Sequence, residues 1–359
     1  MPSFHKLKVK DIKRETPQCV SIAFDIPDSL KSEFSYKQGQ YLTLKKEIKG
    51  EEVRRSYSVC SSPTADPHMR IAVKEIENGR MSPFLNRTLS VGDELDVMTP
   101  MGNFYTEMPQ PQEQHYLAFA AGSGITPVMS LLKTALNAHP DNKFTLFYGN
   151  RNTEQIIFKD ELDSLLEKYR GRLQVIHILS REETSDPMFS GRISPEKCSD
   201  LLTKFDDIKK ADEAFLCGPF EMIMGVKDWL LSNGYAKDNV HFELFTTAEE
   251  AGVKEKVADN DAGSGSGECK VMVVLDGDEV EITVPEGETI LDSVLDAGLD
   301  APYACTGGSC CTCRAKVMEG AAEMGVNYAL TDKEVEEGYI LTCQSHPTTP
   351  TMIVDYDEP

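Results

Sequence analysis

Four cysteines near the end of the chain constrain its fold more than any other feature. Cys305, Cys310 and Cys313 are separated by four and then two residues, and Cys343 follows after 29 intervening residues. The loop reads CTGGSCCTC, and its small residues let the backbone wrap closely around a bound group and aim N–H groups at the sulfurs. The pattern predicts a metal centre held by three thiolates from one loop and a fourth from a distant segment.

This spacing matches that of plant-type ferredoxins, whose four thiolates hold a [2Fe–2S] cluster. A structural zinc usually takes two separated Cys-x2-Cys pairs, so zinc is the less favoured alternative, followed by thiols that bind no metal. Cys311 occupies a position usually held by a small residue, and we expect it to be a non-ligand that points away from the iron. The chain is therefore expected to move electrons.

Charge and hydropathy limit the environment and the partners of the chain. The net charge of −22 makes nucleic acid an unfavourable partner, because phosphate binding needs lysine and arginine. The sequence contains no run of eighteen or more apolar residues, so it gives no indication of a membrane span. The first residues, MPSFHKLKVK, lack the apolar stretch of a secretory signal, so we expect a cytoplasmic protein.

The chain divides by composition into three folded segments and a linker. Residues 1–110 contain short alternating strands, which predict an antiparallel β-barrel or sandwich. Residues 111–248 alternate apolar strands with helical stretches, which predicts an α/β domain with a parallel sheet. Residues 249–268, acidic and ending in Gly/Ser alternation, are expected to be a flexible linker. Residues 269–359 fit a small α+β domain that begins with a hairpin turning at residues 276–278. The resemblance of its cysteine spacing to that of plant-type ferredoxins implies a β-grasp-like ferredoxin domain.

The segment RRSYSV at residues 54–59 resembles the flavin-binding strand of the ferredoxin–NADP reductase family, which carries Arg-x-Tyr-Ser. The resemblance implies that Arg55 binds the FAD pyrophosphate, that Tyr57 lies against the isoalloxazine ring, and that Ser58 hydrogen-bonds near flavin N5. Val59 belongs to the same expected flavin site. Taken alone, the segment is also compatible with a strand that places an arginine on the surface and a tyrosine in the core.

Two further segments match the family in the same order and strengthen this interpretation. Residues 79–82, GRMS, resemble its Gly-x-x-Ser turn, whose backbone amides face the pyrophosphate at a helix start. We therefore expect Gly79, Met81 and Ser82 to contact FAD. Residues 100–104, PMGNF, match the turn that closes the flavin barrel.

A glycine-rich turn marks the nucleotide site of the second domain. The segment GSGITP at residues 122–127 follows an apolar strand and opens a helix, so the backbone can approach a phosphate closely. Pro127 replaces the third glycine of the dinucleotide fingerprint, but Gly-x-Gly-x-Thr-Pro is usual in ferredoxin–NADP reductases. The resemblance implies that Gly122, Gly124 and Thr126 bind the nucleotide.

Residues after the following strands bear on the choice between NADPH and NADH. No acidic residue stands about 20 positions beyond the glycines, where a partner of the NAD ribose would lie. Ser180 and Arg181 resemble the 2′-phosphate contact of the family, and Arg192 is a further candidate. We expect NADPH as the electron donor, while the alternative for Arg181 is a solvated loop residue.

The Cys-Gly-Pro segment that begins at Cys217 resembles the turn beside the nicotinamide in this family. The resemblance implies that Cys217 helps to position the nicotinamide for hydride transfer, with Tyr57 and Ser58 as the other catalytic residues, and that Gly218 lines the cofactor site. Residues 243–245, ELF, resemble an element that reaches back towards the flavin, and a purely structural core role is the alternative.

The resemblance covers the whole chain and implies a reductase component that passes electrons from NADPH through FAD and the cluster to an oxygenase. We expect the oxygenase to be a di-iron enzyme, and a Rieske-type or ketosteroid oxygenase is the alternative. A non-catalytic iron–sulfur carrier would bind neither FAD nor NADPH, and a free flavin reductase would leave the ferredoxin domain idle. Residues 269–359 carry 18 acidic and four basic residues, which indicates either a solvated face or a docking surface for a basic partner.

Overall fold

The computed structural model describes residues 3–205, 209, 211–245 and 268–358. Apart from residue 268, the predicted linker lies outside the described residues. The described chain forms two compact units, each considered separately below. One unit spans Phe4–Pro100 and Phe104–Phe245, and residues 268–358 belong to the other. No helix in the described part of the chain is long and apolar enough to cross a membrane.

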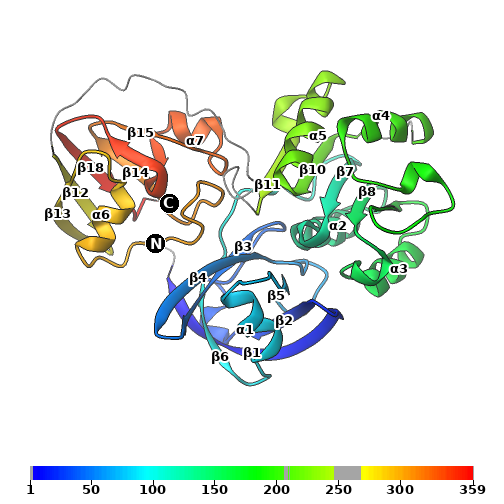
Figure 1. Cartoon of the computed structure of the whole chain (residues 1–359), viewed down its shortest axis with the longest axis horizontal. Coiled ribbons are helices and arrows are strands. Elements are labelled where there is room, and N and C mark those ends of the chain that lie inside the picture. The colour runs from blue at the N-terminus through cyan, green and yellow to red at the C-terminus, as the bar shows by residue number, and fades with distance from the viewer. Residues whose placement is uncertain (1–2, 206–208, 210, 246–267, 359) are drawn as a thin grey trace. The chain divides into compact units, whose positions relative to one another are not determined.

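The N-terminal half of the larger unit is an antiparallel six-stranded barrel (Figure 1), as predicted. An antiparallel bridge between Val59 and Ile71 joins the two edge strands and closes it. Leu7, Ile22 and Leu42 fill its interior. In sheet order, the strands are β4 (Glu51–Ser58), β3 (Tyr41–Ile48), β6 (Glu94–Met98), β1 (Phe4–Thr16), β2 (Cys19–Asp25) and β5 (Arg70–Lys74); η1 (Asp28–Leu30) and α1 (Met81–Arg87) accompany them.

The second half of this unit is an α/β domain with a parallel five-stranded sheet, which confirms the predicted fold class. Helices α2 and α3 pack on one face of the sheet, and α4 and α5 lie on the other (Figure 1). The strands in sheet order are β11 (Val240–Leu244), β10 (Glu213–Gly218), β7 (His115–Ala121), β8 (Lys143–Asn150) and β9 (Leu173–Leu179). The α-helices are α2 (Ile125–Ala138), α3 (Lys159–Lys168), α4 (Pro195–Lys204) and α5 (Phe220–Ser232), and the 3-10 turns are η2 (Gly122–Gly124), η3 (Thr153–Gln155), η4 (Pro187–Phe189) and η6 (Lys237–Asn239).

The strand order of this sheet creates a crevice at the carboxyl ends of its strands, where a ligand can bind. The first strand, β7, lies between β8 and β10, so the chain order reverses at β7 and leaves a crevice where nucleotides bind in open α/β sheets. The hydrophobic core on the α2 face also includes Cys19, Cys60 and Ala72 from the barrel. The barrel and the α/β domain therefore share packed apolar surface.

The C-terminal unit is an α+β domain, as predicted. Its main sheet has the order β13-β12-β18-β14-β16, and β15 pairs with β17 in a small second sheet. The strands are β12 (Cys269–Leu275), β13 (Asp278–Val284), β14 (Arg314–Glu319), β15 (Ala322–Met324), β16 (Tyr339–Leu341), β17 (Ser345–Pro347) and β18 (Thr351–Asp355), with α6 (Ile290–Asp296), α7 (Asp332–Glu336) and η7 (Thr342–Gln344).

The predicted hairpin between β12 and β13 is confirmed. Leu275 pairs with Asp278, and the two residues between them, Asp276 and Gly277, have φ angles of 56° and 80°. Positive φ at both central residues is the requirement of a type I′ turn, whose twist suits a two-residue hairpin. Strand β18 was not predicted from sequence, although it lies at the centre of the sheet, parallel to β12.

Candidate functional site

The four predicted cluster ligands lie as two pairs in the C-terminal unit. Cys305 interacts with Cys310, and Cys313 interacts with Cys343. Cys305 is partly exposed and the other three sulfurs belong to buried residues. Neither pair includes Cys311, whose expected role as a non-ligand stays a prediction.

The loop backbone is arranged around these sulfurs as the sequence predicts. The N–H of Gly307 donates to Cys305 Sγ at 3.4 Å. Gly308 has a φ of 72°, and a Cβ at this position would lie 2.9 Å from the carbonyl oxygen of Val326. Glycine is required here because both the conformation and the space exclude a side chain.

The paired arrangement fits a [2Fe–2S] cluster better than a single metal ion. In such a cluster each of the two irons takes two cysteine thiolates, whereas a structural zinc draws four ligands to one point. The donor set therefore matches the two-iron centre.

A buried hydrogen-bonded chain anchors the distant ligand to the loop. Both the N–H and the hydroxyl of Thr342 donate to the carbonyl oxygen of Cys313, at 3.1 and 2.9 Å. The phenol of Tyr356, at the end of the C-terminal strand, donates to the Thr342 hydroxyl at 2.9 Å. These contacts hold Cys343, the next residue in the chain, beside Cys313.

The predicted flavin strand is β4, and the residues expected to contact FAD differ in their exposure. Arg55 is exposed, and its guanidinium donates to the carbonyl oxygen of Arg54 at 2.7 Å. Tyr57 is half-buried, and burial raises the pKa of its phenol. Ser58 and Val59 are buried. An exposed arginine beside a partly buried aromatic ring, both on one side of the strand, fits a ligand with a pyrophosphate and a planar ring system.

The second predicted flavin element is a tight turn that leads into α1. The N–H of Gly79 donates to Ile76 O, and the N–H of Ile76 donates to the Ser82 hydroxyl at 3.0 Å. Met81 and Ser82 are both buried. The structure thus gives Ser82 a definite role in closing the turn, and its predicted contact with FAD stays a prediction.

The predicted nucleotide turn packs directly against the predicted nicotinamide turn. A Cβ on Gly124 would lie 2.1 Å from the carbonyl oxygen of Cys217, so only glycine allows this approach. Gly122 has a φ of 55°, and its carbonyl oxygen accepts a hydrogen bond from Tyr148 at 3.0 Å. Thr126 donates to Ser123 O at 2.9 Å. The start of α2 and the end of β10 therefore form one tightly packed corner.

Three polar side chains from separate elements meet at this corner. Ser58 at the end of β4 donates to Glu243 Oε2 at 3.0 Å, and Glu243 on β11 pairs in register with Cys217 on β10. Burial raises the pKa of the Glu243 carboxyl to about 7, although the bond from Ser58 opposes the shift. Burial, followed by the charge of Glu243, raises the pKa of the Cys217 thiol well above its usual range, so this thiol is not an activated nucleophile.

The raised pKa of Glu243 predicts a pH dependence of stability. Below pH 7 the buried carboxyl keeps a proton that the unfolded chain releases near pH 4.5, so the native state loses stability as pH rises from about 4.5 to about 7. Glu243→Gln should remove this loss, which is on the order of 3 kcal/mol. Chemical unfolding followed by flavin fluorescence between pH 4.5 and 8 checks it, and parallel profiles for both proteins would contradict it.

The motif at residues 243–245 contains Glu243 but does not single it out, and no motif in the sequence contains Lys74. A Cβ on Gly122 would lie 3.6 Å from Lys74 Nζ, so this β5 side chain borders the nucleotide turn. Burial, and then the charge of Arg151, lower the pKa of Lys74. Two mutually repelling cations near a glycine turn favour an anionic ligand.

The predicted 2′-phosphate contact lies where the chain leaves β9. The N–H groups of Ser180 and Arg181 donate to the carbonyl oxygens of Asn150 and Arg151, at 2.9 and 2.8 Å, which brings the loops after β8 and β9 together. Arg181 is exposed, as is Arg192. These backbone bonds hold the loop that carries Arg181. Its contact with a phosphate stays a prediction.

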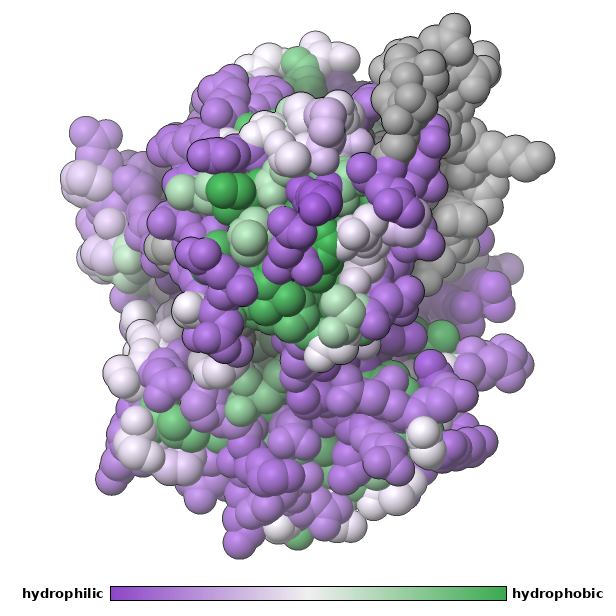
Figure 2. Space-filling view, turned by 90° about the vertical axis from the view of Figure 1, so that its left-hand side faces the viewer, coloured by the Kyte–Doolittle hydropathy of each residue, from purple (hydrophilic) through white to green (hydrophobic). Residues whose placement is uncertain are grey.

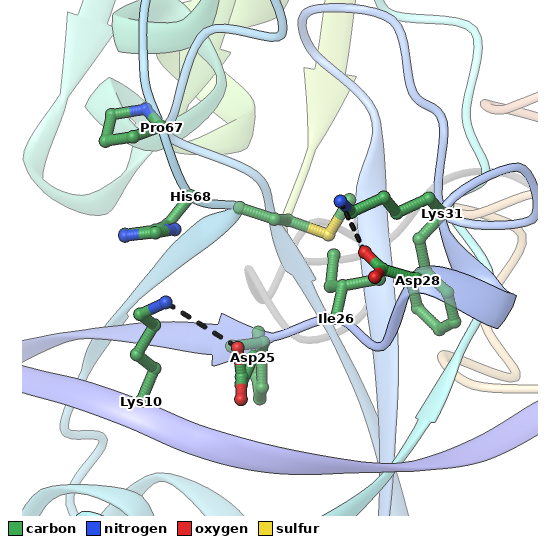
Figure 3. A pocket seen from close by; sticks show the side chains of 10 residues that line it. Lys10, Asp25, Ile26, Asp28, Lys31, Pro67 and His68 are labelled. Carbon is green, nitrogen blue, oxygen red and sulfur yellow. Dashed lines mark ion pairs between the residues drawn. The ribbon is translucent and has the colours of Figure 1, made fainter.

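A cavity of about 400 Å³ lies elsewhere on the barrel (Figure 3). Its labelled charged side chains already pair with one another: Lys10 with Asp25 at 3.6 Å, and Lys31 with Asp28 at 2.6 Å. None of the predicted cofactor residues lines it. We therefore assign no ligand to this cavity.

Three family models match successive parts of the chain. An oxidoreductase FAD-binding domain matches residues 6–105, an oxidoreductase NAD-binding domain matches residues 119–228, and a 2Fe-2S iron–sulfur cluster binding domain matches residues 273–348. Together with the paired cysteines and the nucleotide corner, they define the class: an NAD(P)H-dependent oxidoreductase with FAD and a [2Fe–2S] cluster.

Similar proteins that align over nearly the whole chain show which kind of oxidoreductase this is. The chain is 39% identical to a subunit of 1,2-phenylacetyl-CoA epoxidase from Escherichia coli, over 99% of both chains. It is 34% identical to the ferredoxin reductase component of 3-ketosteroid-9-alpha-monooxygenase from Rhodococcus rhodochrous, over 98% of this chain and 96% of that one. The fold of phthalate dioxygenase reductase matches with a TM-score of 0.58 at 24% identity, covering 98% of both chains. The chain belongs to the family of reductase components of multicomponent oxygenases.

Proposed function

We propose that this chain takes electrons from NADPH and delivers them, through FAD and then the [2Fe–2S] cluster, to the di-iron oxygenase of a phenylacetyl-CoA epoxidase system. The single observation that carries the choice of oxygenase is the 39% identity to a component of that epoxidase over 99% of both chains. A ketosteroid oxygenase is the second candidate, because its reductase component aligns over nearly the same length at 34% identity.

The corner formed by Ser58, Cys217 and Glu243 supports hydride transfer as the first reaction. Bound FAD supplies the conversion of a two-electron donor into single electrons. Ser58 and Tyr57 would hold the flavin on the barrel side, and Cys217 would position the nicotinamide on the opposite side. Glu243 would orient Ser58, and because its pKa is raised to about 7, its carboxyl carries less negative charge near neutral pH than an ordinary glutamate does.

The basic residues near the nucleotide turn support a phosphate-bearing donor. Lys74 and Arg151 would bind the pyrophosphate beside Gly122, which relieves their mutual repulsion. Arg181 would bind the 2′-phosphate that distinguishes NADPH from NADH, because a guanidinium suits phosphate oxygens. The preference for NADPH therefore rests on Arg181.

The oxygenase would dock on the acidic C-terminal domain. The 18 acidic and four basic residues of segment 269–359 give it a net charge of −14, which would steer a basic partner. The face in Figure 2 is mostly hydrophilic with one hydrophobic area in its upper half. Met318 is 48% exposed in the same domain and could contribute apolar contact at a docking site.

Reconstitution with candidate oxygenases tests this proposal. NADPH, this protein and either the phenylacetyl-CoA epoxidase or a ketosteroid oxygenase would be combined, and product formation measured by mass spectrometry. We expect turnover with the epoxidase to exceed turnover with the ketosteroid enzyme by at least tenfold. The reverse order would contradict the choice of oxygenase, whereas the absence of NADPH oxidation in either mixture would contradict the proposed electron path.

A further inference from the structure

A second contact between the barrel and the α/β domain lies beyond the nucleotide corner. Residues 60–69 connect the flavin strand β4 to β5, and helix α2 continues from the nucleotide turn. Both segments therefore begin at predicted cofactor residues and then meet each other. Their contact is centred on Lys133, in the third turn of α2.

Lys133 is a buried cation held between two carboxylates. Its side chain is 9% exposed, and Nζ lies 2.7 Å from Asp66 Oδ2 and 2.9 Å from Glu161 Oε1. Asp66 belongs to the 60–69 segment and Glu161 to α3. Burial alone would lower the pKa of Lys133, but the neighbouring anionic groups, led by Glu161, hold it above its usual value. The lysine therefore stays charged and bridges the barrel to two helices of the α/β domain.

Neutral hydrogen bonds surround this ion triad. The hydroxyl of Ser130 donates to Ser61 O at 2.6 Å, and the hydroxyls of Ser62 and Thr134 lie 2.8 Å apart. The N–H of Ser62 donates to Asp66 Oδ2 at 2.7 Å. Each of these groups is on α2 or in the segment that follows the flavin strand. The contact thus extends over a little more than one turn of α2.

We propose that Lys133 is a positioning residue that fixes the distance between the flavin and the nicotinamide. This inference rests on the proposed function, because it takes β4 as the flavin strand and the start of α2 as the nucleotide turn. Lys133 touches neither cofactor site. It acts by holding the segment after Ser58 against the helix that begins beside Gly124.

The physical basis is that Lys133 is a buried charge and that the two segments it joins lead directly from Ser58 and from Gly124. Removing the lysine leaves Asp66 and Glu161 facing each other without their counterion, which favours separation of the two segments. Hydride transfer requires the reacting atoms to lie about 3–3.5 Å apart, and a displacement of about 1 Å can lower a rate on the order of 100-fold. A small loosening of this contact should therefore slow chemistry more than it weakens binding.

The test compares Lys133→Met with a matched lysine. Lys159→Met removes a lysine of α3 whose side chain is 43% exposed and pairs with Asp163, four residues along the same helix, at 2.7 Å. Both holoproteins, each with FAD and cluster content verified, would be mixed anaerobically with NADPH and with 4-deuterated NADPH. Stopped-flow absorbance gives the limiting rate of flavin reduction, the NADPH concentration at half that rate, and the isotope effect.

For Lys133→Met we expect the limiting rate to fall at least tenfold, a larger isotope effect, and less than a threefold change in the half-saturating NADPH concentration. Lys159→Met should match the wild type, and Lys133→Arg should recover part of the rate. If Lys133→Met does not fold, Asp66→Asn provides the same test with a smaller change. A limiting rate within twofold of the wild type in the folded variant would overturn the inference. Failure of NADPH to reduce the wild-type flavin would instead refute the proposed function.

Discussion

Replacing Cys343 with serine should abolish electron delivery to cytochrome c or to an oxygenase, with a loss of at least 100-fold. Cys343 pairs with Cys313 and is the ligand supplied from outside the loop, so its loss leaves one iron with a single thiolate from the protein. The NADPH-dependent reduction of FAD should remain within about twofold of the wild type. Stopped-flow flavin reduction and steady-state cytochrome c reduction measure the two steps separately.

Cys311→Ser is the matched control because Cys311 is a buried cysteine of the same loop that belongs to neither pair. This variant should keep the cluster absorbance and at least half of the cytochrome c reductase activity. Flavin reduction that fell as far as electron delivery in Cys343→Ser would show that the two functions are not divided between the domains as described.

Replacing Arg181 with alanine should raise the KM for NADPH by a factor of about 20 to 100 and leave the KM for NADH nearly unchanged. The expected loss corresponds to about 2 to 3 kcal/mol, the range for a charged hydrogen bond to a phosphate. Arg181 is exposed at the end of β9, so its removal should not disturb the core. Steady-state kinetics of flavin-dependent ferricyanide reduction with both nucleotides provide the measurement.

Arg170→Ala serves as the control for this experiment. Arg170 is an exposed arginine just before β9 and has the same charge, but it lies at the opposite end of that strand from Arg181. Its replacement should leave both KM values unchanged. An unchanged ratio of the two KM values in Arg181→Ala would remove the 2′-phosphate assignment and, with it, the expected preference for NADPH.

Local patterns were sufficient to predict the architecture of all three folded segments. Three features each depend on neighbours within a few residues and can therefore be predicted directly from the sequence. They are the Asp276-Gly277 turn, the apolar strands of the parallel sheet and the cysteine spacing. Strand β18 was missed because TMIVD is a five-residue run without a turn signal that identifies its partner. Its central place depends on long-range pairing with β12 and β14.

The candidate site also depends on long-range contacts that could not be predicted from the sequence. Ser58 and Cys217 could be predicted from motifs, but the importance of Glu243 arises from the register between β11 and β10 and from its contact with a strand 185 residues earlier. Lys133 resembles an ordinary helical lysine in sequence. Only the tertiary structure places it, buried, between Asp66 and Glu161.

The most direct test of the proposed electron path is an anaerobic titration of the purified protein with NADPH, followed by both visible absorbance and electron paramagnetic resonance. We predict that NADPH bleaches the flavin band and that the signal of a reduced [2Fe–2S] cluster then develops without any added mediator. A flavin that is reduced while the cluster stays oxidised, in protein whose cluster dithionite can reduce, would contradict the path from nicotinamide through flavin to cluster.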